Sequence, residues 1–201
     1  QLSDFKGTIG LVLRQGELRN LALGCFAFVG LQTTFIAYFV VYLTELGFSL
    51  IEAGTIFSLA TAVAIPGRIF WGWISSSFIN PRVMLGLLAI FMFITVSLTG
   101  MFSASWASWL IVFVSASVSA TVFSWHGVTL AEAARLAPSS MKGAVTGGVL
   151  SFGQFGGLVL PLIYSLCLST TGSYQVGFFV CGIPALAVGL LLLQSTLNSK
   201  A

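Results

Sequence analysis

The sequence predicts an all-α integral membrane protein with six transmembrane helices. Of the 201 residues, 57% are hydrophobic and only 6% are charged, whereas a soluble domain carries about 25% charged residues. Six apolar runs can be drawn, and each is about as long as the roughly 20 residues that a helix needs to cross a bilayer. The charged residues lie almost entirely at the boundaries of these runs. These three observations argue strongly against a water-soluble fold.

The six predicted helices follow one another with short connections. A capping box formed by Ser49 and Glu52 predicts the start of the second helix. The pair Asn80-Pro81 predicts a turn before the third helix, and Gly172 separates the fifth helix from the sixth. The helices are centred on Leu21–Leu43, Gly54–Ser75, Val83–Phe102, Trp106–Ala134, Ser140–Leu168 and Tyr174–Leu193.

Three prolines, Pro66, Pro161 and Pro184, fall inside the predicted helices. A membrane helix tolerates a proline kink when neighbouring groups bond the freed carbonyls. Trp71 and Trp73 lie near one end of the second helix. We expect both indole rings to anchor that end at the membrane interface.

Cations and anions divide between the two ends of the predicted helices. The loops on one side carry no Lys or Arg, only Glu45 and Glu52. Because translocation of Lys or Arg is disfavoured, the opposite side is predicted to be cytoplasmic. All eight cations fall on that side: Lys6, Arg14, Arg19, Arg68, Arg82, Arg135, Lys142 and Lys200. We therefore expect a multi-pass protein of the cell inner (plasma) membrane, with both ends of this segment in the cytoplasm.

This threading divides the chain into three parts. Residues 1–17 are expected to form a cytoplasmic linker segment, residues 18–197 a six-helix transmembrane bundle, and residues 198–201 a cytoplasmic tail. The net charge of +3 comes from basic residues that are few and dispersed. A dispersed charge of this kind does not indicate a nucleic-acid partner.

The sequence offers no metal or cofactor motif. Its three cysteines, Cys25, Cys167 and Cys181, lie inside apolar runs without metal-ligand spacing, and we interpret them as small buried hydrophobic residues. An intramembrane serine protease is not indicated, since no G-x-S-G occurs. We therefore do not expect an enzyme. A channel, or a structural membrane protein assembled as an oligomer, remains an alternative.

Small and polar residues recur along single faces of two predicted helices. In a membrane such stripes face other helices or a water-filled path, because close backbone approach drives helix packing and polar groups avoid lipid. On the fifth helix one side carries Gly143, Gly147, Gln154, Gly157 and Pro161, and Gly153 forms a G-x-x-x-G with Gly157; the fourth helix carries Ser115, Ser119, His126 and Thr129.

Several motifs resemble those of the C-terminal six-helix half of a bacterial major facilitator superfamily transporter. Leu13–Leu21 looks like the end of that family's central cytoplasmic loop, and Tyr42–Gly54 resembles its usual outer turn. Gly67–Gly72 is similar to its G-R-x-x-x-G run. Leu130–Pro138, followed by Gly143–Gly148, resembles the junction between its tenth and eleventh helices. The resemblance, in the order of these segments on six helices, covers nearly the whole chain.

One position departs from the family pattern. The family's inner-loop signature continues with Asp and then Arg, whereas this chain has Ser76 and Ser77 there. Only Arg82 remains of the basic residues that follow. Any latch on this side of the membrane must therefore use other groups.

The resemblance implies a fold of twelve helices in two halves, with the substrate at the midplane and alternating access as the transport step. The partners would be the lipid bilayer, a small solute and an N-terminal six-helix half that is missing here. We expect a secondary transporter of the symport kind, with an organic anion as the solute. A half that works as a symmetric dimer is the alternative.

Arg68 and His126 carry most of the expected chemistry. His126, the single histidine, lies nine residues before Arg135, or about 13 Å from the inner end. It could bind an anion or relay a proton; a neutral ring bonded within the bundle is the plainer alternative. Arg68 lies about 11 Å deep and could contact an anion or form a gating ion pair with Glu132. Its alternative is to reach back to the membrane surface.

Three further side chains complete the expected substrate site with His126. Gln32 and Gln154 lie near the midplane, and Tyr38 lies further out on the first helix. Glutamine in a membrane helix usually bonds another helix, so helix packing is the alternative role for both amides.

Overall fold

The computed structural model describes residues 2–198, so Lys200 and most of the expected tail lie outside the described residues. Within 2–198 the chain contains nine helices and no strand, which confirms the predicted all-α class. The helices are α1 (Leu2–Arg14), α2 (Gly16–Glu45), α3 (Leu50–Ala62), α4 (Ala64–Ser77), α5 (Pro81–Gly100), α6 (Ser108–Val122), α7 (His126–Leu136), α8 (Lys142–Thr171) and α9 (Tyr174–Asn198).

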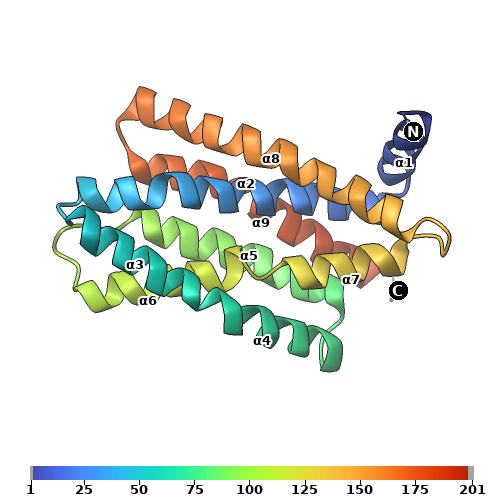
Figure 1. Cartoon of the computed structure of the whole chain (residues 1–201), viewed down its shortest axis with the longest axis horizontal. Helices are drawn as coiled ribbons and strands as arrows, with labels where there is room; N and C mark the ends of the chain where they lie inside the picture. The colour runs from blue at the N-terminus through green and yellow to red at the C-terminus, as the bar shows by residue number, and fades with distance from the viewer. Residues whose placement is uncertain (1, 199–201) are drawn as a thin grey trace.

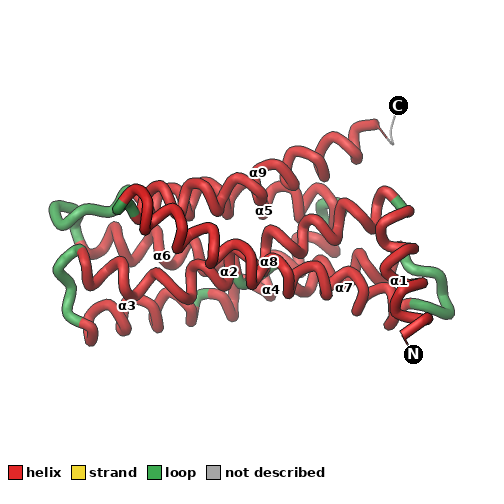
Figure 2. Tube along the Cα trace, turned by 90° about the horizontal axis from the view of Figure 1, so that it is seen from above, coloured by secondary structure: helices red, strands yellow, loops and turns green. Residues whose placement is uncertain are grey.

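Six segments of the described chain are long and apolar enough to span a membrane, as predicted. They are α2, α3 with α4, α5, α6 with α7, α8, and α9. The spans run along one common axis, and α1 lies at one end of the bundle (Figures 1 and 2). Helix α1 occupies most of the segment 1–17, and α2 begins at Gly16.

The connections alternate between the two ends of the bundle (Figure 1). One end holds α1, the end of α9 and the loops after α4 and α7. We call it the basic end, because Arg82, Arg135 and Lys142 lie there. The far end holds the loops after α2, α5 and α8 and carries Glu45 and Glu52. That the basic end faces the cytoplasm stays a prediction.

The local signals at the helix ends act as predicted. Ser49 Oγ accepts a bond from the Glu52 amide, and the Glu52 carboxylate accepts one from the Ser49 amide at 2.8 Å, which completes the capping box. Asn80 Oδ1 accepts from the Arg82 amide at 3.0 Å, with Pro81 as the first helical residue. Gly172 ends α8 with φ of 66°, a conformation that glycine adopts without steric cost.

Helices α2 and α8 cross in direct backbone contact. A Cβ added at Gly156 would collide with the carbonyl of Phe26, and one added at Gly153 would meet Val29 at 2.6 Å. By contrast, Gly143 and Gly147 face open space. The stripe predicted on the fifth span therefore packs only over its central part.

Helices α5 and α9 meet in the same way. A Cβ at Gly86 would lie 3.1 Å from the carbonyl of Gly189, and a Cβ at Gly189 would lie 3.0 Å from the carbonyl of Gly86. Two glycine crossings thus hold the pairs α2–α8 and α5–α9 in close backbone approach. In lipid, contact of this kind replaces the hydrophobic effect as the cause of helix association.

Two of the spans are broken near mid-depth. The second span breaks at Val63, between α3 and α4, and Pro66 is the third residue of α4. The fourth span breaks between Val122 and His126, where there is no proline. Pro161 and Pro184 lie inside the uninterrupted helices α8 and α9. The break in the fourth span was not predicted.

Gly156→Ala tests the α2–α8 crossing. We expect it to lower the free energy of unfolding in detergent by about 1–3 kcal/mol, because the added methyl group forces the two backbones apart. Gly147→Ala on the same helix is the matched control, and it should change stability by less than about 0.5 kcal/mol. Thermal unfolding of the purified variants measures both. Equal losses at the two positions would contradict the crossing.

Candidate functional site

The break in the fourth span leaves backbone carbonyls that side chains of α4 bond. In an unbroken helix the Ser124 amide would bond the carbonyl of Ala120, but here it bonds Thr121 at 3.1 Å. Trp71 Nε1 donates to the Ala120 carbonyl instead, at 2.8 Å. Trp71 is therefore a partner of the break rather than a free interface anchor.

Arg68 lies one turn before Trp71 and bonds the same break. Its Nε donates to the carbonyl of Phe123 at 2.8 Å. The Nδ1 atom of His126 lies 3.3 Å from the same oxygen. One carbonyl thus joins two of the predicted site residues.

Trp125 links a third predicted residue to this group. The His126 ring stacks on the Trp125 ring with centroids 3.8 Å apart. Trp125 Nε1 also donates to Gln32 Oε1 at 3.3 Å. Gln32, Arg68 and His126 therefore surround a single break, together with Phe123 and Trp125. We call these five residues the break cluster.

The break cluster lies near the middle of the bundle. Arg68 is nine residues from the end of α4 at Ser77, and His126 is ten from the end of α7 at Leu136. At 1.5 Å per residue both lie about 14–15 Å from the basic ends of their helices, and the break itself lies near the centre of the 29-residue span Ser108–Leu136.

The charge in the break cluster is not neutralised by an acid. Arg68 is exposed, His126 is half-buried, and among the side chains that the structure describes, those of residues 7–196, the ion pairs involve Arg82 and Arg135 as cations. The guanidinium Nε is committed to the Phe123 carbonyl. Its two terminal nitrogens have no protein partner in the described part of the chain. A cation at this depth is costly unless an anion or water meets it.

Two other predicted site residues lie apart from the break cluster. The Tyr38 hydroxyl donates to the carbonyl of Pro161 at 3.2 Å, and its ring stacks on Tyr164 at 4.1 Å. Tyr38 thus contacts the kinked part of α8. Gln154 is exposed on α8, and its amide makes no hydrogen bond within the described residues.

The expected pairing of Arg68 with Glu132 does not form. Glu132 is buried, with 1% of its side chain exposed, and it accepts from Arg82 Nε at 2.9 Å and from Arg135 Nη2 at 2.7 Å. The two side chains do not pair because they lie at different depths along the bundle. Glu132 lies four residues, or about 6 Å, from the end of α7, whereas Arg68 lies about 8 Å further in. A gating role for either residue stays a prediction.

Four charged side chains form a network at the basic end. Arg82, at the start of α5, bonds both Glu132 of α7 and Glu17 of α2. Arg135 completes it through two bonds to Glu132, each 2.7 Å long. The network therefore ties three spans together. Sequence reasoning missed Arg82 and Glu17, although all four residues lie at the same predicted boundary.

Arg82→Ala tests this basic-end network. Removing the Arg82 side chain leaves the buried Glu132 carboxylate with Arg135, which is exposed, as its single partner. We therefore expect a loss of roughly 3 kcal/mol in the free energy of unfolding. Arg19→Ala, which removes an exposed cation without an ion-pair partner in the described residues, should cost less than about 0.5 kcal/mol.

The double variant Arg82→Met/Glu132→Leu checks the cause. Because both buried charges are then absent, it should recover most of the stability that Arg82→Ala loses. Chemical unfolding in detergent measures all three variants. A double variant as unstable as Arg82→Ala would show that packing of the Arg82 stem matters more than the charge.

No metal site occurs among the described residues: no three His, Cys, Asp or Glu side chains come close enough to hold an ion. Cys25 and Cys181 are buried, and the Cys181 thiol donates to the Leu160 carbonyl at 3.3 Å.

Comparison with known protein families identifies a match over most of the chain. The family model described as Major Facilitator Superfamily matches residues 2–159, which is most of the chain and includes the break cluster and the basic-end network. No curated protein matches the chain.

Proposed function

This chain belongs to the Major Facilitator Superfamily, and from that premise we propose that it is the C-terminal half of a secondary transporter for a small organic anion. The solute would bind at the break cluster and cross by alternating access. The observation that carries this proposal is Arg68, a mid-depth cation that no acid of the described chain neutralises.

Broken helices are suited to such a site. Transporters bind solutes near the midplane at discontinuous helices, where unpaired backbone groups and half-helix ends line a cavity. Here α7 begins at His126, beside the Arg68 guanidinium. An anion lying between these two residues would meet the positive end of α7 and the two terminal nitrogens of Arg68. Gln32, held by Trp125, would supply a neutral contact.

The distribution of burial supports the proposal of a second half. The second and fifth spans are the least buried, with 22% and 28% of their most apolar windows buried, against 44–56% for the other four. Large apolar side chains of these two spans are exposed, among them Ile65, Ile69, Leu158 and Leu162. Another six-helix half would cover this surface. The basic end would then face the cytoplasm under the positive-inside rule.

The two breaks suggest how the half changes shape. They lie side by side, since Ser124 Oγ lies 3.5 Å from the Ala64 carbonyl and a Cβ at Gly67 would lie 3.3 Å from the Ala120 carbonyl. We propose that α4 and α7 tilt together about this point. The basic-end network, which holds α7 to α2 and α5, would be the latch that opens and closes.

Arg68→Ala and His126→Ala in the complete transporter test the proposal. A hydrogen bond to a charged group contributes about 1.5–3 kcal/mol, so Arg68→Ala should weaken solute affinity by at least about tenfold. Arg68→Lys keeps the charge but loses the Nε bond to Phe123, and it should recover only part of the affinity. Tracer uptake into vesicles measures these effects, with Arg19→Ala as the control.

Counterflow in the same vesicles distinguishes a carrier from a channel. Unlabelled solute inside the vesicles should accelerate entry of labelled solute, because the binding site of a carrier reorients across the membrane faster when solute occupies it. Absence of counterflow, or normal anion uptake by Arg68→Ala, would contradict the proposed function.

A further inference from the structure

The hydrogen bonds of the break cluster determine which atoms of its side chains remain for a solute. Arg68 Nε and His126 Nδ1 both meet the carbonyl oxygen of Phe123, at 2.8 and 3.3 Å. A carbonyl oxygen can only accept, so His126 Nδ1 must carry the hydrogen and donate it. A neutral imidazole has a single N–H group, and its other nitrogen is then an acceptor. In the neutral ring, His126 Nε2 is therefore a hydrogen-bond acceptor.

The surroundings of His126 favour the neutral ring. Arg68 of α4 is the charged group of the described chain whose charge acts on the ring. Glu132, the acid of α7, is already bonded to Arg82 and Arg135. A proton on His126 Nε2 would add a second positive charge beside the guanidinium without an acid to meet it. Such a charge is costly at mid-depth in a membrane.

Two nitrogen atoms of the break cluster are accessible and unbonded. His126 Nε2 and Gln32 Nε2 make no hydrogen bond within the described residues, and neither is among the polar atoms that are buried without a partner. Gln32 Oε1 is taken by Trp125, so the free nitrogen of that amide is a donor. Arg68 is exposed, and its terminal nitrogens are donors as well. The break cluster therefore offers one acceptor beside several donors and one positive charge.

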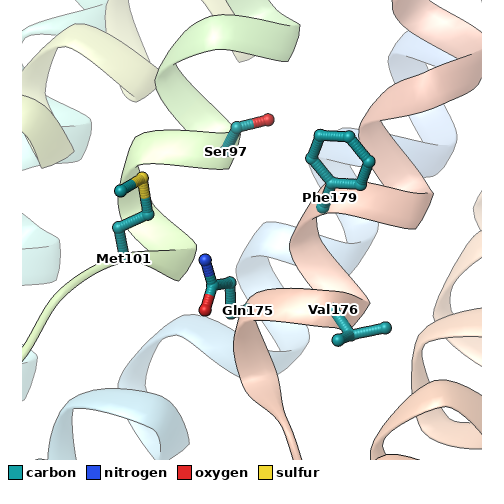
Figure 3. Close-up of a pocket in the computed structure, with 5 residues that line it drawn as sticks. All are labelled: Ser97, Met101, Gln175, Val176 and Phe179. Carbon is teal, nitrogen blue, oxygen red and sulfur yellow. The ribbon is translucent and has the colours of Figure 1, made fainter.

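The hollow between α5 and α9 lacks this combination (Figure 3). It has a volume of about 370 Å³ and is lined by Ser97, Met101, Gln175, Val176 and Phe179. None of these side chains carries a charge, and the Ser97 hydroxyl is buried. The hollow thus presents the amide of Gln175 and otherwise an apolar surface, whereas the break cluster joins a cation to an accessible acceptor.

An acceptor beside a cation favours a particular kind of anion. A carboxylate has acceptor oxygens only, so it pairs with the Arg68 guanidinium but is repelled by the lone pair of His126 Nε2. A hydroxyl group on the same solute donates to that nitrogen. An ammonium group also donates, but it places a second positive charge beside Arg68. The cluster therefore favours a hydroxyl rather than an amine next to the carboxylate.

We propose that the break cluster selects hydroxycarboxylates whose hydroxyl group is adjacent to the carboxylate. The carboxylate accepts from the terminal nitrogens of Arg68 and from Gln32 Nε2, and the hydroxyl donates to His126 Nε2. Because Arg68 and His126 bond the same carbonyl oxygen, the two groups of the solute must also lie close together. This inference rests on the proposed function and names the class of organic anion. His126 Nε2 determines specificity, because an analogue without the hydroxyl leaves this acceptor unbonded.

Matched solutes test the class on the complete transporter. Lactate, propionate and alanine differ at one position, which carries a hydroxyl group, a hydrogen or an ammonium group. Phenyllactate and phenylpropionate form a larger pair. Stabilisation of the purified protein against heat gives each affinity, at about pH 8, where a histidine is neutral. We expect each hydroxy acid to bind at least about threefold more tightly than its deoxy analogue, and alanine to bind least.

Three variants separate the hydroxyl contact from the carboxylate contact. His126→Phe keeps a ring to stack on Trp125 but removes Nε2, so the ratio of the two affinities in each pair should fall to about one. Arg68→Ala should weaken binding of both acids. Gln175→Leu, which changes the exposed amide in the hollow of Figure 3, should alter neither the affinities nor their ratio and serves as the control.

The outcomes distinguish this inference from the proposed function. Equal affinities for lactate and propionate, both lost in Arg68→Ala, would overturn the hydroxyl assignment and leave the anion site standing. A preference for lactate that persists in His126→Phe would also overturn it. If no anion of either pair stabilises the protein, both proposals are contradicted. Where a variant does not fold, the comparison of solutes on the unmodified protein decides.

Discussion

The carbonyl groups at the broken fourth span determine how α4 packs against α6 and α7, and the proposed site depends on that packing. No water is available in the hydrocarbon core, so each opened carbonyl needs a donor from the protein or from a lined cavity. Trp71 and Arg68 supply these donors from successive turns of α4. As a result, α4 is fixed against the break, and a cation is held at mid-depth where it would otherwise be unstable.

This arrangement gives Arg68 one structural bond and, under the proposed function, a second task in binding the solute. The Nε bond to Phe123 maintains backbone geometry, and the two terminal nitrogens remain for a ligand. A planar guanidinium can do both because its donors point in fixed, separate directions. Under the proposed function, a solute bound at Arg68 would also act on the position of α7 through the Phe123 carbonyl, and this joint use of one side chain would couple solute binding to helix movement.

The sequence predicted the six spans, the capping box and the loop positions, because apolar length and turn chemistry are local properties. It also predicted Gln32, Arg68 and His126 as site residues, and the structure brings these three to one place. The sequence did not reveal which charged side chains pair, because pairing depends on the relative depth of residues on different helices. Glu132 pairs with Arg82 rather than Arg68, because helix depth, which single-helix spacing does not reveal, separates Arg68 from Glu132. The break near Ser124 was missed because its donors come from a different helix.

The basic-end network has an electrical consequence. Glu17 and Glu132 carry two negative charges, and Arg82 and Arg135 carry two positive ones. Because these sum to zero, their joint displacement across the membrane field does almost no electrical work, at about 2.3 kcal/mol per net charge per 100 mV. Opening or closing this end would therefore be nearly independent of the resting potential. Within this half, Arg68 and the charge of the solute would then be the sources of voltage sensitivity at the proposed site.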